Sequence, residues 1–297
     1  MPVRKLVPLL QSALLLLVTL PAGATELTGA RASGRGGVGL ANPSDVGEID
    51  TNVAAVALSE RYDLVAGGTY GPDDTWMGRV AAADSRTSVV TLGASYTYRV
   101  DDVEPPLSAL PGWVLADDEI TNLTAHQGFA LGIAYPFLDR RLSIAATGRY
   151  DWRDSEQEGA SDGFNFGVSA AGKPSEAVTV ALGINNALDL GYPDIERTVD
   201  LGVRWEPGPF LGLEAVLRTE WMGDPFEESI GEHVGVDVGL TQWLRVSGGW
   251  QHDGGLHTVG GGLSLVSDKA DLDYSLQGAV DTDPGRLWHT LDLRVHF

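Results

Sequence analysis

The sequence predicts an all-β fold: a transmembrane antiparallel β-barrel of about 14 strands, with a small N-terminal plug in its lumen. Three observations lead to this prediction. Apolar and polar residues alternate along most of the chain, which is the period of a strand with one apolar face. The segments between these stretches are short and long in turn, as in membrane barrels. The chain also ends on an aromatic residue, Phe297, at the last position of an alternating stretch.

Residues 1–24 have the pattern of a secretory signal peptide. Arg4 and Lys5 precede an apolar run from Leu6 to Leu20, and small residues up to Ala24 follow it. A retained anchor helix is the alternative, which the shortness of the run argues against. No later run reaches the roughly 18 apolar residues that a spanning helix needs. We therefore expect an exported chain that crosses the outer membrane of a Gram-negative bacterium with strands.

Residues 25–60 do not alternate like the rest of the chain. They are rich in glycine and alanine, with a turn at Asn42-Pro43 and a position at Ser44 or Asp45 that could cap a short helical turn. We expect this segment to form the plug and residues 61–297 to form the barrel.

Fourteen alternating segments follow residue 60. The clearest runs from Thr87 to Val100, where apolar residues occupy every second position. The predicted strands are 62–70, 75–83, 87–99, 127–135, 141–152, 163–171, 178–186, 198–205, 211–221, 233–240, 244–251, 257–265, 270–280 and 288–297. An even number places both ends of the barrel on the side of the short turns, which is the periplasmic side.

Aromatic residues supply an independent indication. Trp76, Tyr98 and Trp250 fall at the long-loop ends of strands, while Trp243 and Phe297 fall at the short-turn ends. Two such belts fit the two interfaces of a bilayer. The alternative is a soluble periplasmic β-sandwich with scattered aromatics, which would stay in solution without detergent.

Charged residues on the polar strand faces are nearly balanced, and every cation among them is arginine. We expect them to form a ladder of paired charges in the lumen, because the guanidinium group pairs with a carboxylate through two hydrogen bonds. A pore lining that sets selectivity is the alternative. The members singled out are Arg99, Arg149, Arg204, Arg218, Glu214 and Asp237.

The acidic excess lies in the predicted outer loops, and the whole chain has a formal net charge of −21. This balance argues against nucleic acid as a partner. Carboxylates such as Asp101 and Asp117 could instead hold divalent cations that bridge to the anionic lipopolysaccharide of the outer leaflet. No cofactor is predicted beyond such ions.

His233, His252 and His257 fall on neighbouring strands near the outer rim, beside Glu232 and Asp253. Together they could hold zinc or copper, although hydrated rim histidines without a metal are the commoner arrangement. No serine is shown to meet a histidine for hydrolase chemistry, so we predict no enzymatic activity. Gly260-Gly261-Gly262 lies inside a strand pattern and indicates close packing more than a phosphate cradle.

The N-terminal segment resembles the signature of the FadL/PorV-like outer-membrane proteins. It carries Gly29-Ala30-Arg31-Ala32-Ser33-Gly34-Arg35-Gly36-Gly37 and then Asn52-Val53-Ala54-Ala55. The residues matched to the plug are Arg31, Gly36, Gly37 and Asn52. The family usually has proline where this chain has Val53, so the turn of the hatch can differ. The resemblance implies a fourteen-stranded barrel with a hatch inside it.

The same resemblance implies two alternative functions. The FadL-like branch passes small hydrophobic molecules, and the PorV-like branch is a non-transporting scaffold or a subunit of a secretion machinery. A terminal aromatic such as Phe297 is also the signal by which such barrels engage the barrel-assembly machinery. The expected partners are therefore outer-membrane lipid, lipopolysaccharide, that machinery and a small hydrophobic ligand.

Overall fold

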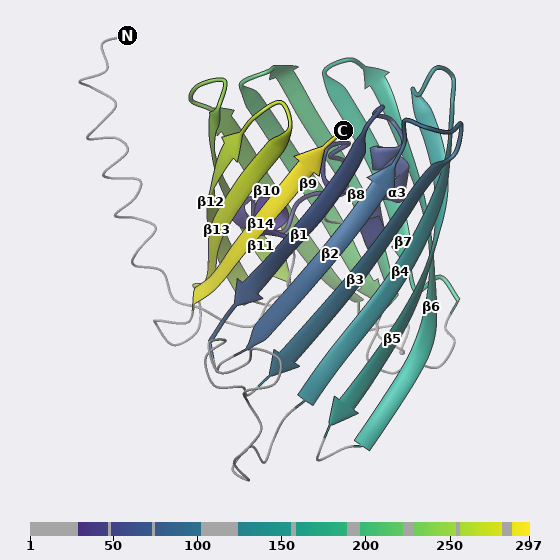
Figure 1. Ribbon diagram of the computed structural model, residues 1–297, viewed down its shortest axis with the longest axis vertical. Helices are drawn as coiled ribbons and strands as arrows, with labels where there is room; N and C mark the ends of the chain where they lie inside the picture. Colours follow the sequence, from purple (N-terminus) through teal and green to yellow (C-terminus); the bar gives the residue numbers. More distant parts are fainter. Residues whose placement is uncertain are drawn as a thin grey trace, which may run out of the picture.

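The computed structural model describes residues 29–46, 49–72, 75–101, 124–155, 159–188, 197–221, 228–253, 256–280 and 287–297. These residues form one closed barrel in which every strand pairs antiparallel with its two neighbours in sequence, and β14 closes onto β1 (Figure 1). In the part of the chain described here, no helix is long and apolar enough to cross a membrane.

The predicted fourteen-stranded barrel is confirmed. The strands are β1 (Tyr62–Tyr70), β2 (Trp76–Asp84), β3 (Thr91–Asp101), β4 (Thr124–Phe137), β5 (Leu142–Ser155), β6 (Gly159–Ser175), β7 (Val178–Asn185), β8 (Arg197–Gly208), β9 (Leu211–Trp221), β10 (Glu228–Gly239), β11 (Leu244–Asp253), β12 (Leu256–Val266), β13 (Ala270–Ala279) and β14 (Leu287–His296).

Several strands are longer than the alternation predicts. β6 begins at Gly159 instead of 163 and ends at Ser175, and β10 begins at Glu228 instead of 233. The extra residues are mostly glycine, serine and charged residues, so they carry no continuous alternation, but their backbone groups still pair across the ladder. Strands β4–β6 project farther than the others at the long-loop end of the barrel (Figure 1).

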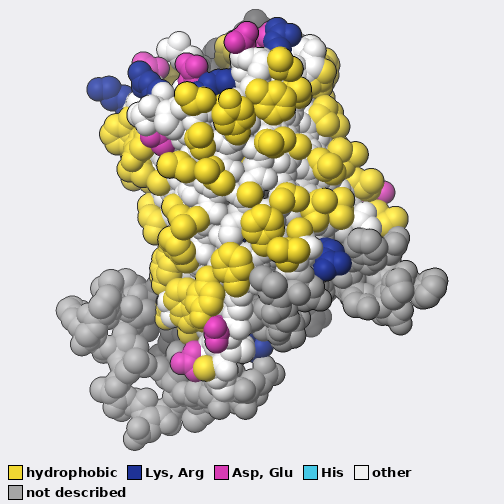
Figure 2. Space-filling model, turned by 90° about the vertical axis from the view of Figure 1, so that its right-hand side faces the viewer, with side chains coloured by type: hydrophobic (Ala, Val, Ile, Leu, Met, Phe, Trp, Pro, Cys, Tyr) yellow, Lys and Arg dark blue, Asp and Glu magenta, His cyan; other side chains and the backbone are white. Residues whose placement is uncertain are grey.

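The outer surface of the barrel is apolar. Large hydrophobic side chains that point outward are about half exposed, including Leu131 (55%), Ile144 (56%) and Leu291 (51%). Figure 2 shows these side chains as a broad band around the visible face, with Lys, Arg, Asp and Glu mostly at its two ends. An apolar band on a closed barrel is suited to lipid, since closure leaves no strand edge unpaired.

Two short helices lie inside the barrel, in the half nearer the C-terminus (Figure 1). Helix α2 (Ala30–Gly34) packs against β11–β14, and helix α3 (Ile49–Val56) packs against β2–β7. The coil of residues 38–46 crosses the lumen between them. The segment predicted as the plug therefore occupies the lumen, while residues 1–28, which include the predicted signal peptide, lie outside the described residues.

Candidate functional site: the plugged lumen

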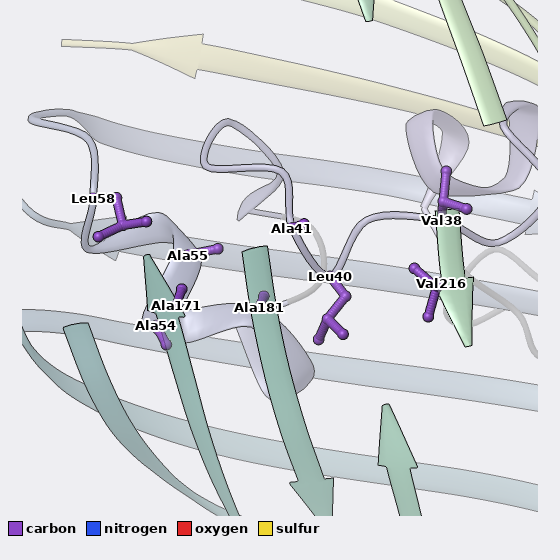
Figure 3. Packing of buried hydrophobic residues seen from close by; sticks show 9 residues of the cluster. All are labelled: Val38, Leu40, Ala41, Ala54, Ala55, Leu58, Ala171, Ala181 and Val216. Carbon is purple, nitrogen blue, oxygen red and sulfur yellow. The ribbon is translucent and has the colours of Figure 1, made fainter. Parts of the chain in front are cut away.

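The plug fills its half of the barrel with small apolar side chains. One cluster joins the coil and α3 to β6, β7 and β9 (Figure 3); its members are Val38, Leu40, Ala41, Ala54, Ala55, Leu58, Ala171, Ala181 and Val216. A second cluster centres on Val46, Ile49, Val53 and Val56, all fully buried. Packing of this kind leaves little room for water between these side chains.

Glycines in the wall make room for the plug. A Cβ atom at Gly132 would lie 2.3 Å from Val53 Cγ2, and one at Gly93 would lie 2.3 Å from Ile49 Cγ1. Val53, which stands where the related signature has proline, is thus a packing residue of α3. Asn52 also lies in α3, but its side chain is outside the described part of the structure.

A network of buried charges ties the plug to the wall. Arg35 is 2% exposed, and its guanidinium lies 2.8 Å from Asp45 and 3.4 Å from Glu214 on β9. Glu214 also accepts a hydrogen bond from the Ala41 amide at 2.9 Å and pairs with Arg204 at 3.3 Å. Asp45 pairs in addition with Arg294 of β14 at 3.3 Å. Each carboxylate therefore joins the plug to the barrel.

The start of the plug is held by the opposite wall. Arg31 pairs with Asp271 and with Asp273, both on β13. The Ala30 amide donates to Asp292 at 2.8 Å, and Asp292 also pairs with Arg79 of β2 at 3.0 Å. Asp292 thus accepts from a plug group and from a barrel arginine together.

The electrostatics favour an ionised Asp45. Burial alone would raise the pKa of Asp45, but the guanidinium groups of Arg294 and Arg35 lower it below the usual aspartate value of 3.8. The carboxylate consequently keeps its charge in the folded plug at neutral pH.

A glycine turn brings the plug backbone against the wall. Gly36 and Gly37 have positive φ angles of 71° and 77°, which side chains rarely adopt. A Cβ atom on Gly37 would lie 2.6 Å from Gln251 Oε1, and one on Gly36 would lie 2.4 Å from the Trp250 amide nitrogen. The turn therefore requires glycine for its shape and for its space.

The glycine cluster of β12 has a related role. A Cβ atom at Gly260 would lie 2.1 Å from the Ser33 carbonyl oxygen, and one at Gly262 would approach Gly34 at 3.3 Å. Helix α2 packs directly against these glycines, in agreement with the close packing expected from the sequence.

The predicted charge ladder is present in part: some of its arginines pair with carboxylates on neighbouring strands. Arg204 pairs with Glu214 and, at 3.0 Å, with Asp237, and Arg218 pairs with Asp200 at 2.8 Å across neighbouring strands. Arg149 instead pairs along its own strand, with Asp151 at 2.7 Å. Arg99 points into the lumen on β3, as its alternation predicts. The network has more members than predicted, because Arg31 and Arg35 of the plug also pair with carboxylates of the wall.

The three candidate metal-binding histidines are not brought together. His233 points into the lumen, where its Nε2 lies 2.9 Å from Asp253 and its Nδ1 lies 3.4 Å from the Gly37 carbonyl oxygen. His252 and His257 pair on the outer face, with ring centroids 4.5 Å apart. Within the described ranges, no group of three or more His, Asp or Glu side chains is arranged to hold a metal ion.

The separation has a simple cause. The register pairs His233 with Gln251 and Glu232 with His252. Successive residues of a strand face opposite sides of the wall, so His233 faces the lumen and His252 faces outward. His233 joins the contacts of the Gly36-Gly37 turn. The acidic residues of the longest outer loop, including Asp117, lie in 102–123, outside the described residues.

A cavity of about 250 Å³ lies at the short-turn end of β8–β11. Its charged lining residues are Arg204, Glu206, Asp237 and Arg245, and Phe210 lines it from the β8–β9 turn. The cavity is near the plug, because Arg204 of its lining also pairs with Glu214, the wall carboxylate that binds Arg35 and the Ala41 amide of the plug.

Solved structures of other proteins share this architecture. No protein-family model matches the chain, and no curated protein matches its sequence. The toluene transporter TodX of Pseudomonas putida superimposes with a TM-score of 0.67 at 10% identity, covering 93% of this chain and 98% of TodX. The chain has the FadL-type barrel fold.

Other solved structures with the FadL-type fold agree. The monoaromatic hydrocarbon channel CymD gives a TM-score of 0.66 at 10% identity, covering 92% of this chain and 98% of its own. A FadL homologue of Pseudomonas aeruginosa gives 0.64 at 11% identity, covering 93% and 99%. The likeness thus includes both the barrel and most of the chain inside it.

Sequence reasoning overlooked the two residues that organise this FadL-type lumen. Arg35 and Asp45 lie in the non-alternating segment, where no strand face assigns a direction to their side chains. The only signal was indirect: isolated charges in a stretch of otherwise small apolar residues, which need partners when buried.

Proposed function

We propose that the protein is an outer-membrane channel for the passage of small hydrophobic molecules, kept closed by its N-terminal plug. The observation that supports this most directly is a packed plug, with its own buried ion pairs, inside a barrel of the FadL-type fold. A purely structural barrel does not need a separate segment that fills its lumen. The solved neighbours that share the fold include a toluene transporter and monoaromatic hydrocarbon channels.

The proposal assigns a non-enzymatic role. Its cargo belongs to the class of single-ring or similarly small hydrocarbons, because the plug and the wall beside it offer alanine, valine, leucine and glycine surfaces. Engagement of the assembly machinery through Phe297 stays a prediction. Phe297 lies at the end of β14, 61% exposed, with its ring packed against Tyr62.

The test is uptake by whole cells of a Gram-negative host that lacks hydrocarbon channels. Phospholipid bilayers dissolve toluene, so the barrier must be an intact lipopolysaccharide leaflet. Cells that make the protein should accumulate labelled toluene faster than cells carrying an empty vector, while uptake of a polar sugar stays equal. Equal toluene uptake in both cells would refute the proposed function.

A further inference from the structure

The lipid-facing surface of the barrel is hollowed over β2–β5. Large hydrophobic side chains cover much of the outer face, but Ala82 and Ala94 lie opposite each other there, and Gly148 lies two strands farther along the same row. Ala82 faces outward because Ala81 and Ala83 are buried, and residues directly opposite in a ladder share a face. Small side chains at neighbouring outward positions leave a groove.

The groove is long and narrow. It has a volume of about 480 Å³ and crosses six strands, from Tyr62 on β1 to Phe166 on β6. Leu131 and Ile133, which are 55% and 52% exposed, stand along it. Because neighbouring strands lie about 4.8 Å apart, it extends over roughly 24 Å. One leaflet contributes about 15 Å of hydrocarbon, so a tilted lipid chain can lie in the groove over its whole length.

The volume of the groove corresponds to a single hydrocarbon chain. A cavity of about 150 Å³ holds one molecule of benzene. By that measure, the groove has room for roughly 19 carbon atoms. This is the size of one membrane acyl chain, and it is too small for two.

A cation stands at the short-turn end of the groove. Asp84 is the last groove residue of β2, and Arg86 follows it, exposed, in the β2–β3 turn. The Arg86 guanidinium donates to the Phe297 carbonyl oxygen at 2.8 Å. Since a guanidinium has five N–H donors, it can bind a phosphate and keep this contact. The Asp84 carboxylate accepts from the Arg86 and Thr87 amides, at 3.0 and 2.9 Å, so it is directed into the turn.

This end of the groove belongs to the inner leaflet. The short turns of outer-membrane barrels face the periplasm, and the leaflet on that side consists of phospholipid. Tyr62 lies there with its ring edge-on to that of Phe297, the two centroids being 5.4 Å apart. Aromatic rings take such positions at the level of lipid headgroups. A phosphate at Arg86 would therefore lie at the depth where its chain can enter the groove.

We propose that the protein binds one phospholipid of the inner leaflet, with an acyl chain laid over Ala82, Ala94 and Gly148 and its phosphate at Arg86. In a bilayer, packing and hydrogen bonds decide such an association, because lipid tails are as apolar as the wall. A chain in the groove gains dispersion contacts with its floor and both sides, and Arg86 adds a charged hydrogen bond. The site is on the outside of the wall and is independent of the proposed channel function.

Native mass spectrometry of the full chain, purified from outer membranes in a mild detergent, counts the phospholipids that it retains. The wild-type protein should carry one adduct with the mass of a phospholipid. Ala94→Trp fills the groove and should remove this adduct. Ala215→Trp is the matched control, because Ala215 faces outward on β9 between Val203 and Val234 and lies outside the groove. This control should keep the lipid, and circular dichroism should show the same strand signal for both variants.

A titration tests the contact with the phosphate. In detergent micelles, delipidated protein is titrated with phosphatidylglycerol. Arg86→Gln should weaken its binding about tenfold, the effect of one lost charged hydrogen bond. Arg141→Gln, which changes an exposed arginine of another short turn, should leave the affinity unchanged.

Three results would overturn the proposal. The first is a wild-type protein that retains no phospholipid, or that retains lipopolysaccharide in its place. The second is a loss of lipid in Ala215→Trp as complete as that in Ala94→Trp. The third is an affinity for phosphatidylglycerol that Arg86→Gln leaves unchanged. Each is distinct from a failure of the proposed channel function, which toluene uptake measures.

Discussion

Replacing Arg35 by methionine tests whether buried ion pairs hold the plug in place. The guanidinium pairs with Asp45 and Glu214 and donates to two backbone carbonyls, and the side chain is 2% exposed. Methionine fills similar space but leaves both carboxylates with one partner fewer. Breaking a buried pair by removing one member costs about 3–5 kcal/mol.

The structure indicates the lower end of that range. Asp45 keeps Arg294, and Glu214 keeps Arg204, so neither carboxylate is left without an arginine. A loss of about 3 kcal/mol raises the population of undocked plug by about a hundredfold. The barrel itself should stay folded, because Arg35 does not take part in the strand ladders.

Hydrogen exchange of the backbone amides measures this population directly. In Arg35→Met, amides of the plug should exchange about a hundredfold faster, while those of β1–β14 keep their wild-type rates. Arg141→Met is the matched control, because Arg141 pairs with Glu176 at an exposed turn and should change nothing measurable. Unchanged exchange of the plug in Arg35→Met would refute the assignment of Arg35 as its anchor.

Two further predictions concern the same plug. Gly37→Ala should weaken docking by about 1–2 kcal/mol or more, because the residue has a φ of 77° and its Cβ would lie 2.6 Å from a side-chain oxygen of the wall. Gly159→Ala, with a similar φ of 81° and no atom within 4 Å, should leave plug exchange unchanged. Docking should also weaken in acid, because the lowered pKa of Asp45 gives stability that is present above 3.8 and is lost as the pH falls through the folded value. Exchange of the plug amides against pH measures this loss, and Asp45→Asn should remove that part of the dependence.

Alternation alone was enough to predict the barrel. In each strand, apolar and polar side chains alternate with a period of two residues, so the inward and outward faces follow from the local sequence. The fourteen predicted segments correspond to the fourteen strands in chain order. Strand ends were less well predicted at β6 and β10, since pairing continues beyond the point where apolar and polar residues stop alternating. The lumenal direction of Arg204, Glu214 and Asp237 followed from the same parity.

The register between strands could not be obtained in this way. His233 and His252 seemed neighbours because their strands are adjacent, but pairing sets His233 beside Gln251 and sends His252 to the lipid side. The plug is a stronger case. Its coil has no repeat, so its sequence gives neither the direction of Arg35 nor the wall that Ala41 meets.

The sequence by itself thus determined the barrel, the balance of charge on its inner face and the existence of a separate N-terminal segment, because these depend on local patterns. Only the tertiary structure decided that Arg35, Asp45 and Glu214 form the anchor of the plug, and that a cavity lies on the β8–β11 side of the lumen. The physical reason is that buried charges are satisfied by partners far apart in the chain, and closure of the barrel is what brings those partners together.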